Sequence, residues 1–191
     1  MVTTATYASA MTHLPIWYIG QIPTDVCDAA VRDFMAIEPQ SASMGVEGEY
    51  ENKTHRDTEL RFAPADHWFG GIMYEHGLTA NKHVGWDYHI TGHENVQFGS
   101  YGPAGHYGWH MDTFPLSGQP LDRKVSVICL MSDPSEYEGG DLEIQLYQDY
   151  KVEMQKGQII AFPSMLQHRV LPIISGTRTS AVIWLNGPRM R

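Results

Sequence analysis

From residue 86 onward the chain is a succession of short segments that are rich in Val, Ile and aromatic residues and are separated by Gly, Pro, Asp or Ser. The segments read WDYHI, NVQFGSY, YGWHMD, KVSVICLMS, DLEIQL, QIIAFPS, QHRVLPI and RTSAVIWLN. Short strands at this spacing are typical of antiparallel β-sandwiches and barrels. The pattern therefore predicts an all-β core over residues 86–188.

The first 85 residues predict a helical and irregular region that supports this core. The stretch PTDVCDAAVRDFMAIEP predicts a helix that Thr24 or Asp25 caps and that Pro39 ends. The stretch PADHWFGGIMYEHGLTA predicts a second helix from Asp66, and this prediction is weaker because the glycines of the stretch lower its helix propensity. The apolar face of the first helix is expected to contain Val26, Ala30 and Phe34.

Residues 41–60 are polar and contain glycine, which indicates a loop or an irregular hairpin between the two helices. This segment is a candidate for contact with a substrate. No internal repeat or linker divides the chain. The predicted fold class is therefore mainly β with N-terminal helices (α+β), in a single domain that spans residues 1–191.

The composition excludes some classes of partner. The formal net charge of −9 argues against binding to nucleic-acid backbones or anionic membranes, because both require a basic surface. Cys27 and Cys129 are too few for a disulfide framework and fit a reducing compartment. The N-terminal residues show neither a signal peptide nor a transmembrane span, so a cytoplasmic protein is expected.

The stretch YGWHMD places a histidine and a carboxylate two residues apart. In an extended strand the side chains of His110 and Asp112 point to the same face and can reach one metal ion. The stretch FPSMLQHRV offers His168 as a third ligand, which would complete the facial triad of non-haem Fe(II) oxygenases. A core histidine that is hydrogen-bonded to the backbone would explain His168 equally well.

A basic residue follows at a fixed distance from this histidine. Arg178 stands ten residues after His168 and opens the apolar stretch RTSAVIWL, where an unpaired guanidinium would be costly to bury. The segment contains no acidic residue. A bound carboxylate ligand is therefore a natural partner for Arg178.

Three stretches together carry a family resemblance, and they read YGPAGHYGWHMD, EGGDLEI and KGQIIAFPSMLQHRVLPIISGTRTSAVIWL. The pattern resembles the 2-oxoglutarate- and Fe(II)-dependent dioxygenases, and within them it is most similar to the prolyl-4-hydroxylase-like group of small bacterial and phage proteins. The resemblance covers residues 86–188. It implies a double-stranded β-helix, also called a jelly roll, in which His110, Asp112 and His168 hold Fe(II).

The same resemblance implies a cosubstrate site. The keto-acid end of 2-oxoglutarate would chelate the iron, and its far carboxylate would pair with Arg178, whose planar guanidinium suits bidentate recognition. Tyr101 matches the tyrosine nine residues before the first metal ligand, whose hydroxyl supports that carboxylate in relatives. Ser180 completes an R-x-S pair and could add a hydroxyl contact. Trp184 is expected at the pocket floor or in the plain core.

The implied activity is hydroxylation of an unactivated C–H bond, with O2 consumed and ascorbate as a candidate reductant. The substrate would be a peptidyl proline or another protein side chain, with a free amino acid or small metabolite as the alternative. Two other classes stay open, namely a cupin-like metalloenzyme that does not use 2-oxoglutarate and a non-catalytic jelly-roll binding module. The oligomeric state is not visible in the sequence.

Other residues near the motif have less defined roles. His89, His93 and His106 are expected to be structural or surface residues, because their segments read as strand and loop rather than helix. The aromatic residues Tyr107, Trp109 and Phe114 flank the candidate metal ligands. They either shape a substrate entrance or pack as ordinary core.

Overall fold

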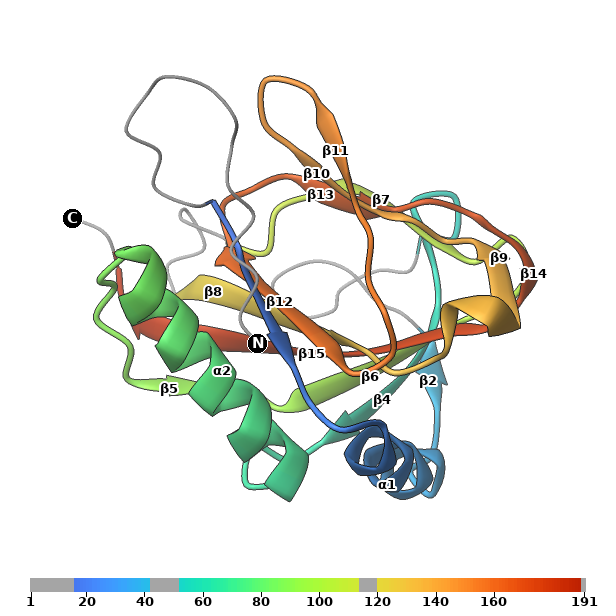
Figure 1. Cartoon of the computed structure of the whole chain (residues 1–191), viewed down its shortest axis with the longest axis horizontal. Coiled ribbons are helices and arrows are strands. Elements are labelled where there is room, and N and C mark those ends of the chain that lie inside the picture. Colours follow the sequence, from blue (N-terminus) through green and yellow to red (C-terminus); the bar gives the residue numbers. More distant parts are fainter. Residues whose placement is uncertain (1–15, 42–51, 114–119, 190–191) are drawn as a thin grey trace.

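The computed structural model describes residues 16–41, 52–113 and 120–189. Two sheets face each other, and two helices cover the outer side of the larger sheet (Figure 1). The helices are α1 (Thr24–Met35) and α2 (Trp68–Val84), and a short 3-10 helix η1 (Pro134–Glu136) lies at one end of the sheets. No helix in these three ranges has the length and apolar character that a membrane crossing requires.

The larger sheet has eight strands, all paired antiparallel. In spatial order its strands are β1 (Tyr18–Gln21), β12 (Gln158–Pro163), β8 (Leu121–Leu130), β15 (Arg178–Pro188), β6 (Val96–Tyr101), β4 (Glu59–Ala63) and β2 (Gln40–Ser41), with β5 (Gly92–His93) paired to β15.

The smaller sheet has five strands and faces the larger one. Its order is β11 (Asp149–Val152), β10 (Leu142–Gln145), β13 (His168–Val170), β7 (His106–His110) and β3 (Arg56–Asp57). A two-stranded ribbon consists of β9 (Tyr137–Gly139) and β14 (Ile173–Gly176). The predicted mainly β fold with two helices is confirmed, and the arrangement is that of a jelly roll.

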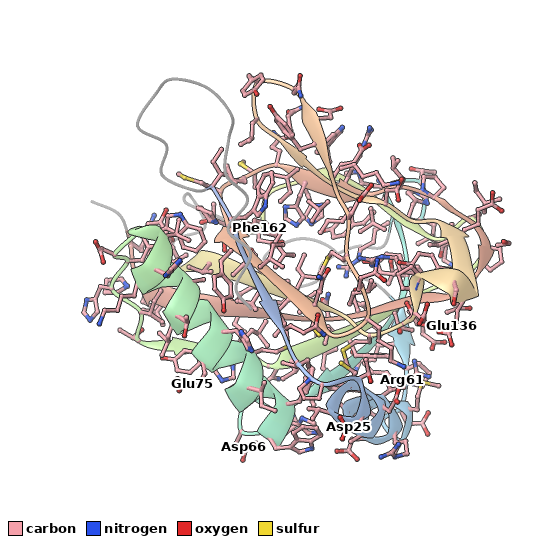
Figure 2. The ribbon with its side chains drawn as sticks, in the orientation of Figure 1. Asp25, Arg61, Asp66, Glu75, Glu136 and Phe162 are labelled. Carbon is pink, nitrogen blue, oxygen red and sulfur yellow. The ribbon has the colours of Figure 1, made fainter. Side chains whose placement is uncertain are left out.

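The larger sheet is buried on both faces, which explains why its central strands read as continuous apolar runs. Along β8, Val127 and Cys129 pack toward the helices, whereas Ile128 and Leu130 face the smaller sheet. Figure 2 shows Phe162 between the two sheets, while Asp25 and the other labelled acidic side chains of the helical side lie on the outside. The space between the sheets is therefore a second core, and polar groups within it need specific partners.

The predicted cap of the first helix and the predicted start of the second were both wrong. Pro23 is the N-cap of α1 and its carbonyl accepts the first helical bond from the Cys27 N–H, so Thr24 and Asp25 lie inside the helix. Helix α2 begins two residues later than predicted, because the His67 ring accepts a hydrogen bond from the Phe69 N–H and takes the cap position. The buried face of α1 contains Cys27, Ala30 and Phe34, with Val26 only partly buried.

Two predictions about strands also need correction. The stretch WDYHI over residues 86–90 forms no strand, because the Asn81 side chain takes both backbone hydrogen bonds of Tyr88, at 2.9 and 3.0 Å. The first 85 residues contribute strands to both sheets, as well as helices. Residues 40–41 and 59–60 pair as two antiparallel strands, and the predicted loop between them lies partly outside the described residues.

Two glycines of α2 test how tightly this helix packs on the larger sheet. A Cβ atom at Gly77 would lie 2.7 Å from Leu185 Cδ2 and 2.9 Å from Val127 Cγ2, and both neighbours are fully buried. Overpacking of this kind costs about 1–3 kcal/mol, against a helix-propensity gain for alanine of about 1 kcal/mol. We expect Gly77→Ala to lower the free energy of unfolding, measured by chemical denaturation.

The matched control is Gly71 in the same helix, where an added Cβ meets nothing within 4 Å. Gly71→Ala should raise the free energy of unfolding by about 0.5–1 kcal/mol, because only the backbone entropy of glycine changes. Equal effects of the two substitutions would show that α2 is loosely packed on the sheet.

Candidate metal centre

Two strands of the smaller sheet bring the predicted histidines together. His110 ends β7 and His168 begins β13, and the antiparallel register of these strands places the two residues directly opposite each other. Their ring centroids lie 4.2 Å apart. Asp112 completes the group, with Oδ1 3.6 Å from His110 Nε2 and Oδ2 3.4 Å from His168 Nε2.

Asp112 reaches this position from outside the strand. The prediction of an extended YGWHMD segment holds only to His110, where β7 ends. The chain then bends, and the Asp112 N–H donates to the Ser164 carbonyl at 2.9 Å. Ser126 Oγ donates to Asp112 Oδ2 at 2.6 Å, and it also lies 2.9 Å from Ser164 Oγ. Two serines that the sequence analysis missed thus orient the carboxylate.

Each histidine presents the same ring nitrogen to Asp112. His110 Nδ1 lies 2.8 Å from the Gly108 carbonyl, and His168 Nδ1 lies 3.0 Å from the Leu166 carbonyl. A carbonyl only accepts hydrogen bonds, so Nδ1 carries the proton in both rings. The lone pair of each Nε2 is then available, as in histidines that bind metals.

Burial sets the charges of this group. Burial lowers the pKa of His110 to about 3, and the nearby His168 adds to the shift. Burial alone would raise the pKa of Asp112, but His168, His110 and the Ser126 hydroxyl outweigh it and hold this pKa below the ordinary value. At neutral pH the group therefore contains a neutral imidazole at His110 and a carboxylate at Asp112, which are the forms that metal ligands take.

The donor set fits a divalent metal ion. The three candidate ligand atoms of His110, Asp112 and His168 lie within 4.8 Å of one another, and the part of the chain that the structure describes contains no other such group of three. Two imidazoles and one carboxylate are the ligand types of non-haem Fe(II) sites, in which the remaining positions stay open. The three residues could therefore hold Fe(II).

A second polar cluster lies on the larger sheet around Arg178. This residue is 2% exposed and begins β15, paired with Tyr101 of β6. Arg178 Nη1 donates to Ser180 Oγ at 3.3 Å, and the guanidinium carbon lies 5.7 Å from the centroid of the Tyr101 ring. Within the described ranges no carboxylate forms an ion pair with Arg178. A buried cation without a counter-charge fits an anionic ligand.

Tyr137 belongs to this cluster and was missed in the sequence. Burial raises the pKa of Tyr137, and the charge of the adjacent Arg178 together with a hydrogen bond between the two side chains opposes that shift. Both residues line a cavity of about 300 Å³ between β9 and the segment after β11. None of the three triad residues lines this cavity.

Arg123 and Trp184 lie beside the triad. Trp184 pairs across the sheet with Ser126, so both residues point toward the interior. The Arg123 guanidinium stacks on the Trp184 ring at 3.7 Å, and it forms two hydrogen bonds to Glu94, at 2.7 and 2.5 Å. Arg123 also donates to the Asp112 carbonyl at 3.5 Å, which ties this pair to the triad.

The aromatic residues of the motif have separate roles. The Tyr107 ring stacks on His110, with centroids 3.5 Å apart, whereas Trp109 lies under the Arg169 guanidinium at 4.4 Å. Phe114 lies outside the described residues. The other histidines that the sequence analysis considered do not join the triad; these are His89, His93 and His106.

Comparison with known proteins agrees with this geometry. A family model described as the 2OG-Fe(II) oxygenase superfamily matches residues 96–186, which include the triad, Tyr101 and Arg178. The match covers slightly less than half of the chain and spans most of the jelly-roll core. The two polar clusters fit the two ligands in the description of that family, Fe(II) and 2-oxoglutarate. The triad suits Fe(II), and the Arg178 guanidinium, which has no carboxylate partner in the described residues, suits a carboxylate.

A curated relative resembles about half of the chain in sequence. A PKHD-type hydroxylase of Stenotrophomonas maltophilia is 33% identical over 93 residues, which are 47% of this chain and 41% of the relative. The chain therefore spans well under two thirds of the length of that relative.

Two solved structures share the fold. A Pseudomonas putida prolyl-4-hydroxylase has a TM-score of 0.69 at 21% identity and covers 92% of this chain and 94% of its own. A prolyl hydroxylase from Trichoplax adhaerens, solved with a hypoxia inducible factor oxygen degradation domain peptide fragment, has a TM-score of 0.66 at 14% identity, over 89% of this chain and 83% of its own. At these identities the likeness establishes the fold.

The contact between Ser126 and Asp112 can be tested by substitution. Ser126→Ala removes the hydroxyl that orients the carboxylate, and losing such an outer partner typically weakens metal binding by about 10–100-fold. We expect this loss in an anaerobic titration with Fe(II), or with Co(II) followed by absorbance.

Ser132 provides the matched control for this measurement. It is also buried, and its Oγ accepts a hydrogen bond from the Thr179 N–H at 3.0 Å, away from the triad. Both alanine variants should lose about 0.5–1.5 kcal/mol of stability, but Ser132→Ala should keep the metal affinity. Equal metal affinities in the two variants would show that Ser126 has no role in orienting Asp112.

Proposed function

We propose that this chain is an Fe(II)- and 2-oxoglutarate-dependent dioxygenase that hydroxylates a C–H bond. The observation that carries the proposal is the pairing of a buried His–Asp–His group with a buried guanidinium that has no carboxylate partner in the described part of the chain. The first feature suits the metal and the second suits the cosubstrate. The match of residues 96–186 to the 2OG-Fe(II) oxygenase superfamily model supports the same assignment.

In this proposal the triad residues bind the metal through His110 Nε2, Asp112 and His168 Nε2. When bound, Fe(II) with 2-oxoglutarate and O2 supplies the oxidant that converts C–H into C–OH, with succinate and CO2 as products. The protein supplies the geometry and a buried site that excludes water. Ser126 holds the carboxylate, and the two backbone carbonyls hold the imidazoles in the tautomer that exposes Nε2.

Arg178 is proposed to bind the far carboxylate of 2-oxoglutarate. Ser180 accepts a hydrogen bond from one guanidinium nitrogen, and Tyr137 contacts the same guanidinium, so Arg178 is held in place before the ligand arrives. Tyr101 lies opposite Arg178 on β6 and is proposed as a second donor to the same carboxylate. Such preorganisation reduces the entropy that binding would otherwise lose.

The proposed substrate is a peptidyl proline or another protein side chain. The support is that the structural relatives are named as prolyl hydroxylases and that one of them was solved with a peptide. A free amino acid or small metabolite remains the second candidate. A cupin-like enzyme without 2-oxoglutarate would leave Arg178 unexplained, and a silent binding module would not need a complete triad.

The whole chain is proposed to act as one domain. Strand β1 pairs with β12 along its full length, and α1 and α2 pack on the outer face of the same sheet. The segment before residue 86 is thus joined to the predicted jelly-roll core by both hydrogen bonds and apolar packing.

The proposal is tested by turnover of 2-oxoglutarate with Fe(II) and ascorbate, measured as succinate. His168→Ala should abolish it, because two remaining ligands do not hold the metal in the required geometry. The control is His83→Ala, since His83 is exposed on α2 and is not one of the three candidate metal ligands. Near-normal turnover in the His168 variant at matched iron would remove His168 from the site.

The role of Arg178 distinguishes the proposed function from that of a cupin-like metalloenzyme that does not use 2-oxoglutarate. Removing one member of a buried charged pair typically costs about 2–5 kcal/mol, so Arg178→Met should raise the dissociation constant for 2-oxoglutarate by tens- to thousands-fold. Arg178→Lys should be impaired less, because it keeps the charge and loses the planar fork. Tyr101→Phe should lose less than Arg178→Met, since it removes one hydrogen bond and no charge.

The measurement is an anaerobic titration of the Fe(II) protein with 2-oxoglutarate, followed by visible absorbance. Iron affinity should stay close to that of the unmodified chain in all three variants. An unchanged affinity for 2-oxoglutarate in Arg178→Met would exclude Arg178 from the site and favour the cupin-like alternative.

A further inference from the structure

A second buried guanidinium lies close to the triad, on the smaller sheet. Arg56 begins β3 and is 7% exposed. Strand β3 pairs with β7, and the register places Arg56 opposite Tyr107. The Arg56 Nε–H is buried and has no hydrogen-bond partner in the part of the chain that the structure describes. A charged donor in this state is unfavourable unless a ligand satisfies it.

The side chain of Arg56 is stacked toward the first histidine of the triad. Its guanidinium carbon lies 4.3 Å from the centroid of the Tyr107 ring, and the Tyr107 ring lies 3.5 Å from the His110 ring at an interplanar angle of 14°. The guanidinium carbon is therefore no farther from the His110 ring centroid than the sum of these two distances. A group bound at Arg56 would lie beside the metal site.

Two other arginines of the chain have the counter-charge that Arg56 lacks among the described residues. Arg61, which is equally buried, forms an ion pair with Glu59 and donates to the Ile37 carbonyl. Arg169 also lies over an aromatic ring but is paired with Glu143 at 2.7 Å. Within the described residues Arg56 has the aromatic contact but no carboxylate.

A neighbouring hydroxyl shares this property. Thr58 lies two residues after Arg56, between β3 and β4. Its Oγ1 is buried and has no hydrogen-bond partner among the described residues. The segment that carries Arg56 thus contains both an unsatisfied charged donor and an unsatisfied hydroxyl.

We propose that Arg56 binds a carboxylate of the substrate and so selects substrates that carry a carboxylate close to the C–H bond to be hydroxylated. This inference rests on the proposed function, because it places the carboxylate beside the proposed metal. Arg56 is assigned to the substrate and Arg178 to the cosubstrate, since the two guanidiniums come from opposite sheets. The planar guanidinium suits bidentate binding of a carboxylate.

A single negative charge fits this position better than a phosphate dianion. Arg56 supplies one positive charge, and the nearby Arg123 is already paired with Glu94. The protein as a whole carries a formal charge of −9, which disfavours a more highly charged ligand. The carboxylate could come from a free amino or carboxylic acid, or from an acidic residue next to the target residue in a peptide.

The test uses acetate as the probe and acetamide as its neutral isostere. The metal-free protein, labelled with ¹⁵N, is titrated with each, and the Nε–H resonances of Arg56 and Arg178 are followed by NMR. Acetate should shift the Arg56 resonance in a saturable way, and acetamide at the same concentration should not. An Arg56 resonance that ignores acetate, or that responds equally to both probes, would overturn the proposal.

Substitutions sharpen the test. Arg56→Gln should weaken acetate binding, read from the amide resonance of Tyr107, by at least about tenfold. Arg169→Gln is the matched control, because Arg169 has the same aromatic contact but its own counter-charge; it should keep the acetate response. The measurement on the unmodified chain decides the point even if a variant fails to fold.

Two probe pairs identify the source of the carboxylate. L-proline is compared with L-prolinamide, and acetyl-Glu-Pro-amide with acetyl-Gln-Pro-amide. A preference of at least about tenfold for the acid in the first pair indicates a free amino acid, and in the second pair an acidic peptide. If neither acid binds more tightly than its amide, the substrate assignment of Arg56 is wrong.

The proposed function can fail independently of this inference. If the unmodified chain does not turn over 2-oxoglutarate but Arg56 still responds to acetate, only the dioxygenase assignment is contradicted. Normal turnover with no acetate response would contradict the carboxylate site alone.

Discussion

The site depends on the antiparallel pairing of β7 with β13, because this register alone sets His168 opposite His110. The third residue, Asp112, links the two sheets, since it follows β7 of the smaller sheet and accepts a hydrogen bond from Ser126 on β8 of the larger one. A metal bound here would therefore link the two sheets. The geometry of the triad consequently depends on the separation of the two sheets, and neither can change without the other.

The strands could be predicted from the sequence because their environment leaves a clear pattern. The central strands of the larger sheet are buried on both faces, so segments such as KVSVICL are almost entirely apolar. The stretch WDYHI contains two aromatic residues and an isoleucine but forms no strand, because Asn81 satisfies the backbone of Tyr88 instead. A contact between a helix and the turn that follows it is not encoded in the composition of either segment.

The site was predictable only in part. The spacing of His110, Asp112 and His168 followed from the motif, but the bend that carries Asp112 out of the strand depends on Ser164, which lies far away in the sequence. Ser126 left a signal that could have been used, because a hydroxyl in the middle of the apolar run KVSVICL must find a partner. Tyr137 and Arg56 left none, since their roles depend on which strand lies opposite.

The two unpaired guanidiniums connect stability with function. Arg56 and Arg178 are buried without carboxylates in the described part of the chain, although Arg61 shows that this fold can supply one. A carboxylate from the protein at either position would neutralise the charge permanently and would compete with the ligand. Leaving the charges unpaired makes the free protein less stable than it could be, and any anion that binds the folded state recovers that stability by mass action. The burial of two such charges, one on each sheet, therefore supports the proposal that each of them binds an anion.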